Sequence, residues 1–140
     1  MAVDGSFTRC GADRGAPQAA RLCVVDGDTL KIPGRESGKL DARTIRIVGI
    51  DAPELRARCP AEAAGAERAT AVLQRWVNAA PFELVPRLDA PTDKYGRELM
   101  TARRPVRGRP GGDRAETAAE VLIEAGVARA YRGEARTGWC

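Results

Sequence analysis

Residues 44–54 read Thr44-Ile45-Arg46-Ile47-Val48-Gly49-Ile50-Asp51-Ala52-Pro53-Glu54. In the first half, Ile45 and Ile47 alternate with Arg46 and Val48, and β-branched residues are frequent. This pattern predicts a half-buried strand over residues 42–49. Pro53 fixes its own φ angle and favours an extended backbone at Ala52, so Asp51 and Glu54 are expected on a stiff turn past the strand's end. Because burying two carboxylates together with Arg46 is costly, the sequence predicts a functional site here.

The chain before this stretch predicts an antiparallel meander. Strands are expected over residues 22–25 and 29–32, joined by the turn Asp26-Gly27-Asp28. A surface turn over residues 33–38 then leads into the strand quoted above. Residues 1–20 mix glycines, a proline and charges without any period, which predicts an irregular N-terminal arm.

Two stretches after Glu54 have helical character. Pro60 opens the first predicted helix, which ends before Pro81. Thr117 and Glu120 form a capping box for the second. The first helix has one apolar face at helical spacing, made of Ala66, Ala69, Leu73, Trp76 and Val77.

The remaining segments predict short strands and loops. Residues 82–86 and 98–102 have strand character and flank a turn at residues 92–97. Residues 103–114 are rich in arginine, glycine and proline, which predicts an exposed basic loop. Five short strands with two or three packed helices are typical of a mainly β fold, the OB-type barrel; a split α+β sandwich is the competing architecture. We therefore predict a single domain over residues 21–140.

The composition is that of a globular protein with a modest positive charge. The chain has 140 residues, of which 44% are hydrophobic and 30% charged, and its net charge is +4. This charge is compatible with an ordinary solvated surface or with a polyanionic partner. Histidine is absent, which excludes histidine-based triads and histidine-liganded zinc. No apolar run is long enough to cross a membrane, and the N-terminus has no signal-peptide core.

The four cysteines, at positions 10, 23, 59 and 140, predict two disulfides and an oxidising compartment. Three pairings are possible, and we favour Cys10 with Cys23 and Cys59 with Cys140 because the second pair would hold the C-terminal tail. We expect a secreted or periplasmic mature form without its signal peptide. A cytoplasmic location, with Cys23 simply buried as a thiol, stays open.

The carboxylates of Asp28 and Asp51 are candidates for a metal site. Both follow strand ends that a meander brings together, and two close carboxylates repel unless a proton or a cation lies between them. A hard divalent cation would relieve this repulsion. Arg46 and Arg97 could then hold a phosphodiester, while Glu54 orients or deprotonates water. The alternative is that the two aspartates cap turns and Arg46 forms an ordinary ion pair.

Five motifs, in order along residues 21–131, resemble the thermonuclease, or staphylococcal nuclease-like, family. They are Val25–Leu30, Ile45–Glu54, Gly65–Ala69, Asp93–Arg97 and Glu124–Ala128. The resemblance implies an OB-fold endonuclease, a calcium-dependent hydrolase that cleaves DNA and RNA to 3′-phosphate and 5′-hydroxyl ends. It also implies a nucleic-acid partner and no membrane, and we expect a monomer.

The resemblance also assigns roles to individual residues. Asp28, Asp51 and the Ala52 backbone carbonyl match the calcium ligands, and Asp26 matches an outer-shell acid. The residues that match the family's catalytic machinery are Arg46 and Arg97, which bind phosphate, and Glu54, the general base. The residues that match its substrate contacts are Lys94, Tyr95 and Tyr131.

The chain departs from the family pattern at three places. Ala52 stands where threonine often occurs, which matters little for a carbonyl ligand. Only Tyr131, with Trp139 further on, replaces a pair of tyrosines after the last helix. The basic loop 103–114 looks longer than usual, and we hypothesise that it guides the substrate backbone. Two other functions compete with the nuclease: a non-catalytic OB module that binds nucleic acid and a structural or protein-interaction domain.

Overall fold

A long antiparallel hairpin forms the centre of the fold. Its strands are β4 (Thr29–Glu36) and β5 (Lys39–Ile47), and β3 (Cys23–Asp26) pairs with the start of β4. This confirms the predicted meander, with longer strands than expected. The structure is a computed structural model that describes residues 1–11, 22–36, 39–106, 114–135 and 137–140.

The sheet curls because β5 also pairs in parallel with β8 (Glu98–Val106), through Ile45 to Ile47 and Glu98 to Met100. The remaining strands of this eight-stranded sheet are β1 (Ala2–Val3), β2 (Thr8–Arg9), β7 (Phe82–Pro86) and β9 (Arg114–Thr117). A separate two-stranded sheet contains β6 (Ile50–Asp51) and β10 (Arg129–Ala130). The mainly β, OB-like class is thus confirmed, but the described residues form more strands than the five predicted.

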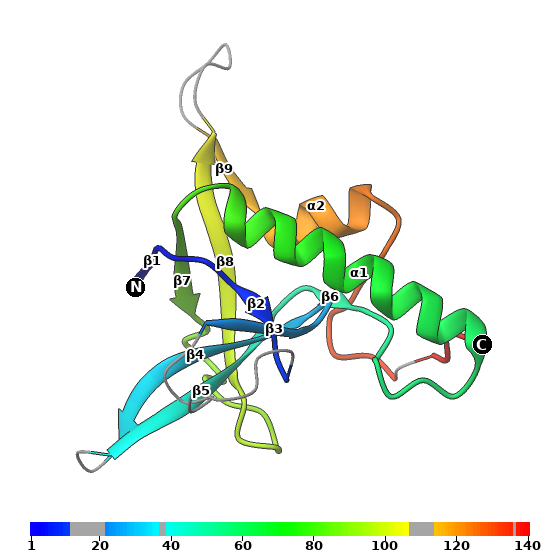
Figure 1. The fold of residues 1–140 in the computed structure, drawn as a ribbon, viewed down its shortest axis with the longest axis horizontal. Helices are drawn as coiled ribbons and strands as arrows, with labels where there is room; N and C mark the ends of the chain where they lie inside the picture. The colour runs from blue at the N-terminus through cyan, green and yellow to red at the C-terminus, as the bar shows by residue number, and fades with distance from the viewer. Residues whose placement is uncertain (12–21, 37–38, 107–113, 136) are drawn as a thin grey trace.

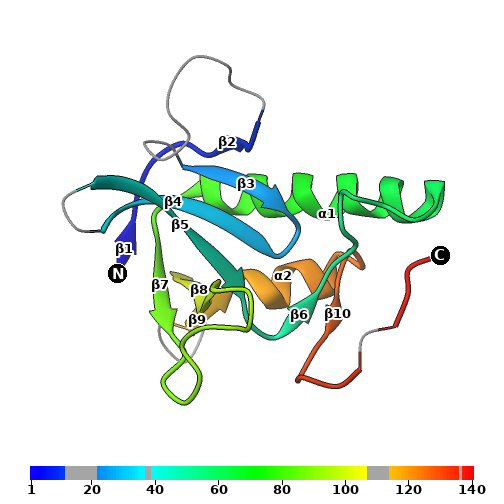
Figure 2. The same cartoon turned by 90° about the horizontal axis from the view of Figure 1, so that it is seen from below.

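Two helices pack against the curled sheet. Helix α1 (Pro60–Ala79) links β6 to β7 and runs beside β3, and α2 (Ala118–Glu124) lies next to α1 (Figures 1 and 2). The predicted apolar face of α1 is confirmed, since all five of its residues are buried: Ala66, Ala69, Leu73, Trp76 and Val77. The Thr117 hydroxyl accepts the Glu120 amide, as the capping box predicted.

Gly27 fixes the distance between the β3–β4 turn and α1. A Cβ atom at this position would lie 2.5 Å from the Ala69 Cβ and 2.9 Å from the Ala52 Cβ. Only glycine therefore lets the turn pack against both the helix and the segment after β6. This close approach holds Asp28, the next residue, at the side of the 51–52 segment.

The N-terminal segment differs from the predicted irregular arm. Strand β1 pairs with β7, β2 pairs in parallel with β3, and Phe7 between them is 1% exposed. Asn78 of α1 accepts the Phe7 amide at 2.7 Å. The first eleven residues are therefore part of the sheet and its core, because pairings across 70 residues satisfy backbone groups that local sequence leaves open. Residues 12–20 lie outside the described residues.

The predicted surface turn at residues 33–38 is wrong for residues 33–36. Residues 33–36 continue β4, with Pro33 opposite Ala42 and Gly34 opposite Asp41. Strand β3 pairs only with residues 29–31 of β4, so Pro33 lies where β4 has β5 as its one partner among the described strands. A proline is tolerated at such an edge, because no ladder hydrogen bond on that side is lost. Residues 37–38 lie outside the described part.

The predicted basic loop 103–114 is also corrected at both of its ends. Its first residues extend β8, and Arg114 begins β9, which pairs antiparallel with β8. Arg104 is not a solvated loop residue: its guanidinium lies 3.9 Å from the centre of the Trp76 ring and donates to the Trp76 and Ala80 carbonyls at the end of α1. Residues 107–113, the middle of the loop, lie outside the described residues, so their proposed role stays a hypothesis.

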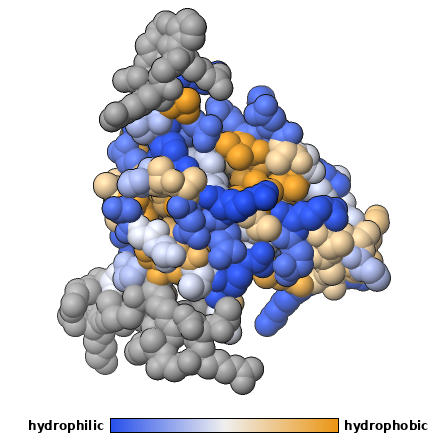
Figure 3. Space-filling view, turned by 45° about the horizontal axis from the view of Figure 1, so that its top comes forward, coloured by the Kyte–Doolittle hydropathy of each residue, from blue (hydrophilic) through white to orange (hydrophobic). Residues whose placement is uncertain are grey.

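Both favoured disulfides are present. Cys10 is bonded to Cys23 and Cys59 to Cys140. On the face that Figure 3 shows, hydrophilic side chains cover most of the surface and apolar ones form separate patches. Neither helix in the described part of the chain is long and apolar enough to traverse a lipid bilayer.

Candidate functional site

The Asp28 carboxylate lies against the backbone that follows Asp51. Its Oδ2 atom accepts the Ala52 amide at 3.1 Å, and its Oδ1 atom accepts the Thr29 hydroxyl at 2.9 Å. Asp28 and Asp51 are each 4% exposed. The structure thus brings one predicted metal ligand next to the segment that holds the other two, as the meander predicted.

Arg46 is a buried cation in contact with this acidic segment. It is 7% exposed, and its Nη2 atom lies 3.5 Å from the Asp28 Oδ2. The guanidinium also donates to the carbonyls of Ile47, at 2.5 Å, and Ile50, at 2.8 Å. Three acceptors thus hold the guanidinium in one orientation, so the Arg46 side chain is fixed in position before an anion binds. The ion pair of the alternative interpretation is present as well.

Asp26 adds further negative charge behind Asp28. Burial, and next the charge of Asp28, raise the pKa of Asp26 to about 7. Its Oδ1 atom accepts the Asp28 amide at 3.2 Å. Asp26 therefore holds the turn that carries Asp28, and its raised pKa reflects first its burial and next the nearby charge of Asp28.

Within the part of the chain that the structure describes, the acids of the site do not form a group of three side chains with closely spaced ligand atoms. Among the described residues, the only three acidic, cysteine or histidine side chains with ligand atoms within 4.8 Å of one another are Cys59, Glu62 and Cys140. The two cysteines form a disulfide, so that group does not bind a metal. Glu54 lies on the exposed turn after Pro53. Asp28, Asp51 and the Ala52 carbonyl are buried hard oxygen donors, which fit a divalent cation that keeps several waters.

Arg46 also lines a cleft of about 710 Å³. Its walls are the end of β5 with the Val48–Gly49 turn, the segment between β7 and β8, and the segment after β10. Of the predicted site residues, Arg46, Lys94, Tyr95, Arg97 and Tyr131 line it. Asp28, Asp51 and Glu54 are not part of its wall, so Arg46 is the residue that joins the acids to the cleft.

Asp93 holds the turn that carries Lys94, Tyr95 and Arg97. One carboxylate oxygen accepts the amides of Tyr95 and Arg97, both at 2.9 Å, and the other accepts the Arg97 Nε at 2.6 Å. Gly96 has a φ of +79°, which a side chain would disfavour. The Tyr95 ring is exposed, with Lys94 Nζ 5.1 Å and the Arg97 guanidinium 5.5 Å from its centre. The turn thus presents a cationic edge and an aromatic face to the cleft.

A family model described as staphylococcal nuclease homologue matches residues 44–138. The chain belongs to this family. The matched part contains Arg46, Asp51, Glu54 and Arg97, whereas Asp28 lies before it and is joined to it only through the contacts described above. A comparison with curated proteins found no match.

The C-terminal segment of this nuclease homologue is fastened next to the site. Arg129 of β10 pairs with Asp51 of β6, and the Tyr131 amide donates to the Gly49 carbonyl at 2.9 Å. The Arg129 guanidinium lies 3.6 Å from the centre of the Trp139 ring. Trp139 therefore packs on Arg129 and is not part of the cleft wall, so it does not replace a second tyrosine there.

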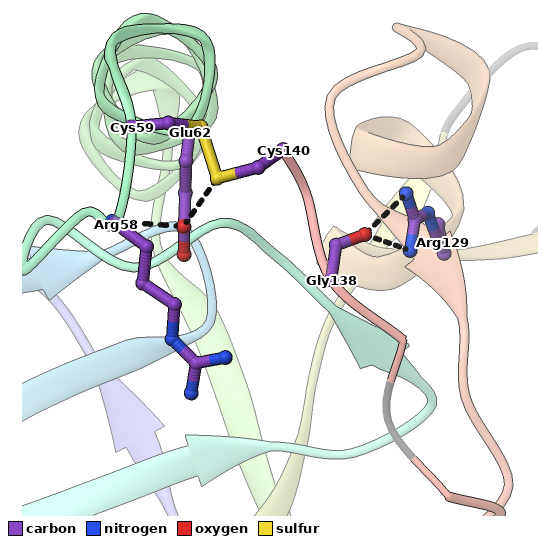
Figure 4. The surroundings of a disulfide bond; sticks show 6 residues. All are labelled: Arg58, Cys59, Glu62, Arg129, Gly138 and Cys140. Atoms are coloured by element: carbon purple, nitrogen blue, oxygen red, sulfur yellow. Dashed lines mark hydrogen bonds between the residues drawn. A yellow bond between two sulfur atoms is a disulfide. The ribbon is translucent and has the colours of Figure 1, made fainter.

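The disulfide between Cys59 and Cys140 fastens the end of this segment to the start of α1 (Figure 4). Glu62, which is buried in the first turn of α1, accepts the Arg58 amide at 3.0 Å and lies 3.5 Å from the Cys140 Sγ. One covalent link thus connects the segment that carries Tyr131 with the loop that follows Glu54.

Sequence reasoning missed three residues of the cleft. Asp93 belongs to the Asp93–Arg97 motif and stands four residues before Arg97, a spacing that signals an ion pair. Arg87 and Arg132 also line the cleft. No local pattern distinguishes these two arginines from the others, because their position depends on the packing of distant segments.

Proposed function

We propose that this domain is a calcium-dependent nuclease that hydrolyses the phosphodiester bonds of DNA and RNA, leaving 3′-phosphate and 5′-hydroxyl ends. The observation that carries the proposal is the position of Arg46. It contacts the buried Asp28 carboxylate and also lines a cleft whose cations suit a polyanion. A phosphate bound at Arg46 would therefore be next to the candidate metal ligands.

Asp28, Asp51 and the Ala52 carbonyl are the proposed ligands of the metal ion. When bound, calcium supplies positive charge that polarises a phosphoryl oxygen and stabilises the more highly charged transition state. Magnesium is a less suitable ion here, because it requires a more regular octahedron and loses its waters reluctantly. The buried, fixed geometry of Asp28 keeps these oxygens in place before substrate arrives.

The side chains divide the reaction among them. Arg46 and Arg97 bind the non-bridging phosphate oxygens, and their planar forks match that geometry. Glu54, exposed at the turn, accepts a proton from the attacking water. The water oxygen forms a bond to phosphorus, the bond from phosphorus to the 5′ oxygen breaks, and that oxygen is protonated. Lys94, Tyr95 and Tyr131 bind the neighbouring part of the strand by charge and stacking.

The test is cleavage of plasmid DNA and of a labelled RNA with calcium, with magnesium, and with chelator. We expect cleavage with calcium and none with chelator. Glu54→Gln should reduce kcat by about 10²-fold or more while binding persists, as expected for a lost general base. Glu124→Gln, an exposed control far along the chain, should leave the rate unchanged.

A non-catalytic binding module gives a different outcome in the same assay. Such a protein would bind the oligonucleotide in chelator and leave it intact with every metal. Undiminished cleavage by Glu54→Gln would refute the role of Glu54 without affecting the rest of the proposal.

Two disulfides in the described chain support a secreted or periplasmic location. We propose that the protein acts there as a monomer. A thiol count under denaturing conditions on protein from its native source tests the location, since four free thiols would contradict it. The molar mass from sedimentation at micromolar concentration tests whether the protein is a monomer.

A further inference from the structure

The cleft contains more positive charge than one phosphodiester requires. Five cationic side chains from three separate segments line it, namely Arg46, Arg87, Lys94, Arg97 and Arg132. Among the described residues, the one acidic residue in the wall is Asp93, whose carboxylate is already occupied by Arg97 and by two amides. This imbalance favours a ligand with more than one negative charge.

Arg87 is held in the cleft wall by its backbone but only weakly by its side chain. Its amide donates to the Leu99 carbonyl at 2.9 Å, which fixes its position beside β8. Its guanidinium binds Asp89 at 2.9 Å, and both side chains are largely exposed, at 48% and 75%. An exposed pair of this kind contributes little to stability, so a phosphate can displace Asp89 at small cost.

Arg132 lines the cleft from the C-terminal segment, just after Tyr131. The pairing of β10 with β6 and the hydrogen bond from Tyr131 to Gly49 set the position of its backbone. The Arg132 amide also donates to the Glu134 carboxylate at 3.1 Å, which shapes the turn that follows. Two arginines from unrelated segments thus face one space of about 710 Å³, a volume typical of sites for ligands much larger than a single phosphate.

We propose that Arg87 and Arg132 bind a second phosphate, that of the nucleotide adjacent to the cleaved phosphodiester. This inference rests on the proposed function and adds two residues to the site. Arg46 and Arg97 hold the phosphate that reacts, and Arg87 and Arg132 hold its neighbour. The site then distinguishes substrates by the number of phosphates they carry through the cleft.

The experiment measures the binding of a fluorescent oligonucleotide of ten thymidines in chelator, so that no cleavage occurs, over a range of salt concentrations. Each lost phosphate contact should lower the slope of log K against log salt by about 0.7. We expect this change for the double variant, and a smaller change for Arg87→Ala or Arg132→Ala alone, because the two arginines share one phosphate. Arg132→Lys should keep the slope, because it keeps the charge.

Two controls make the measurement specific. Arg75→Ala removes an exposed arginine of α1 outside the cleft and should leave the slope unchanged. Asp89→Asn removes the competing carboxylate and should strengthen binding about twofold, but only while Arg87 is present. Thermal melts of all variants check that the fold is intact, which is expected for exposed side chains.

A second readout tests the number of phosphates directly. The wild type should bind a trinucleotide with two phosphodiesters more tightly than a dinucleotide with one, and the double variant should lose this preference. Unchanged slopes and an unchanged preference in the Arg87 and Arg132 variants, with a reduced slope in Arg46→Ala, would overturn the inference alone. A wild type that binds neither oligonucleotide would instead overturn the proposed function.

Discussion

Arg46 contacts two regions that differ in exposure: the buried acidic corner, made of Asp28 and Asp51, and the open cleft. In the corner, Asp28 and Asp51 are each 4% exposed and Asp28 is held by backbone and hydroxyl donors. In the cleft, Tyr95 is 72% exposed, and Arg97 and Arg132 extend from a turn and from the C-terminal segment. The charged side chains of the corner are therefore buried in the folded core, whereas those of the cleft lie at the protein surface. The same kind of substitution should thus have different consequences in the two regions.

Arg46→Ala should have the largest effect, because Arg46 belongs to both regions. It leaves the Asp28 carboxylate and two carbonyls without their buried partner, which should lower the free energy of unfolding by about 3 kcal/mol. It also removes a phosphate ligand, which should reduce kcat/KM by about 10³-fold. Urea unfolding and initial rates measure the two losses. A loss of activity without loss of stability would show that the corner is not part of the core.

Loss of the disulfide between Cys59 and Cys140 should have the next largest effect. The variant Cys59→Ser with Cys140→Ser opens a sequence separation of 81 residues, so we expect a loss of about 4 kcal/mol in unfolding free energy. The bond between Cys10 and Cys23 spans 13 residues and should contribute about 3 kcal/mol.

The two disulfide variants also differ in their expected effect on the cleft. The first bond holds the segment with Tyr131 and Arg132, so its loss should weaken oligonucleotide binding. The second lies at β2 and β3, away from the cleft wall, and its loss should leave binding unchanged below the melting temperature. Equal effects on binding would contradict this difference.

Arg97→Ala should affect activity without affecting stability. Arg97 lies on the turn of the cleft and its main partner is Asp93 on the same turn. We expect about a 10²-fold loss in kcat/KM, the size of one lost phosphate donor, and less than about 1 kcal/mol in unfolding free energy. The comparison with Arg46→Ala, in the same assays, tests whether burial alone separates the two arginines.

The smallest expected effect is a dependence of the unfolding free energy on pH, through Asp93 in the turn that lines the cleft. Partial burial raises the pKa of Asp93, but the hydrogen bonds from Arg97 and from the Tyr95 amide outweigh it and hold the pKa below its ordinary value of 3.8. The turn therefore stabilises the fold above that value, and its contribution is lost as the pH falls through the lower, folded pKa.

Unfolding in urea from about pH 5 downward, with Asp93→Asn as the control, measures this contribution. We expect the wild type to exceed the variant by less than about 1 kcal/mol at pH 5, and this difference to disappear in acid. A difference that persists in acid would show that Asp93 acts through its shape and not through its charge.

Much of the fold was predictable because its signals are local. The alternation around Ile45 and Ile47, the proline at the start of α1 and the apolar face through Leu73 each depend on neighbouring residues alone. The favoured cysteine pairing is confirmed, but position alone did not determine it, because each of the three possible pairings would bond Cys140. The family motifs predict one site for Asp28, Arg46 and Arg97; in the structure Arg46 contacts Asp28 and lines the same cleft as Arg97.

Other features required the tertiary structure. The sequence predicts a turn at residues 33–36 because Pro33 and Gly34 disfavour strands locally. In the structure these residues form part of β4, where β5 is the one partner among the described strands. The N-terminal strands are set by pairing with β7 and β3 and by Phe7 in the core, and these contacts join segments that are not neighbours in the sequence.

The sequence by itself determined both helices and the central strands and indicated which side chains are suited to chemistry, because these depend on residue type and short-range spacing. Only the tertiary structure decided that Arg46 is buried beside Asp28 and also lines the cleft, that Asp28 bonds to the Ala52 amide, and that Arg87 and Arg132 line the same cleft. The physical reason is that burial and the facing of charges are properties of packed, distant segments. Each segment's own sequence is compatible with several such arrangements.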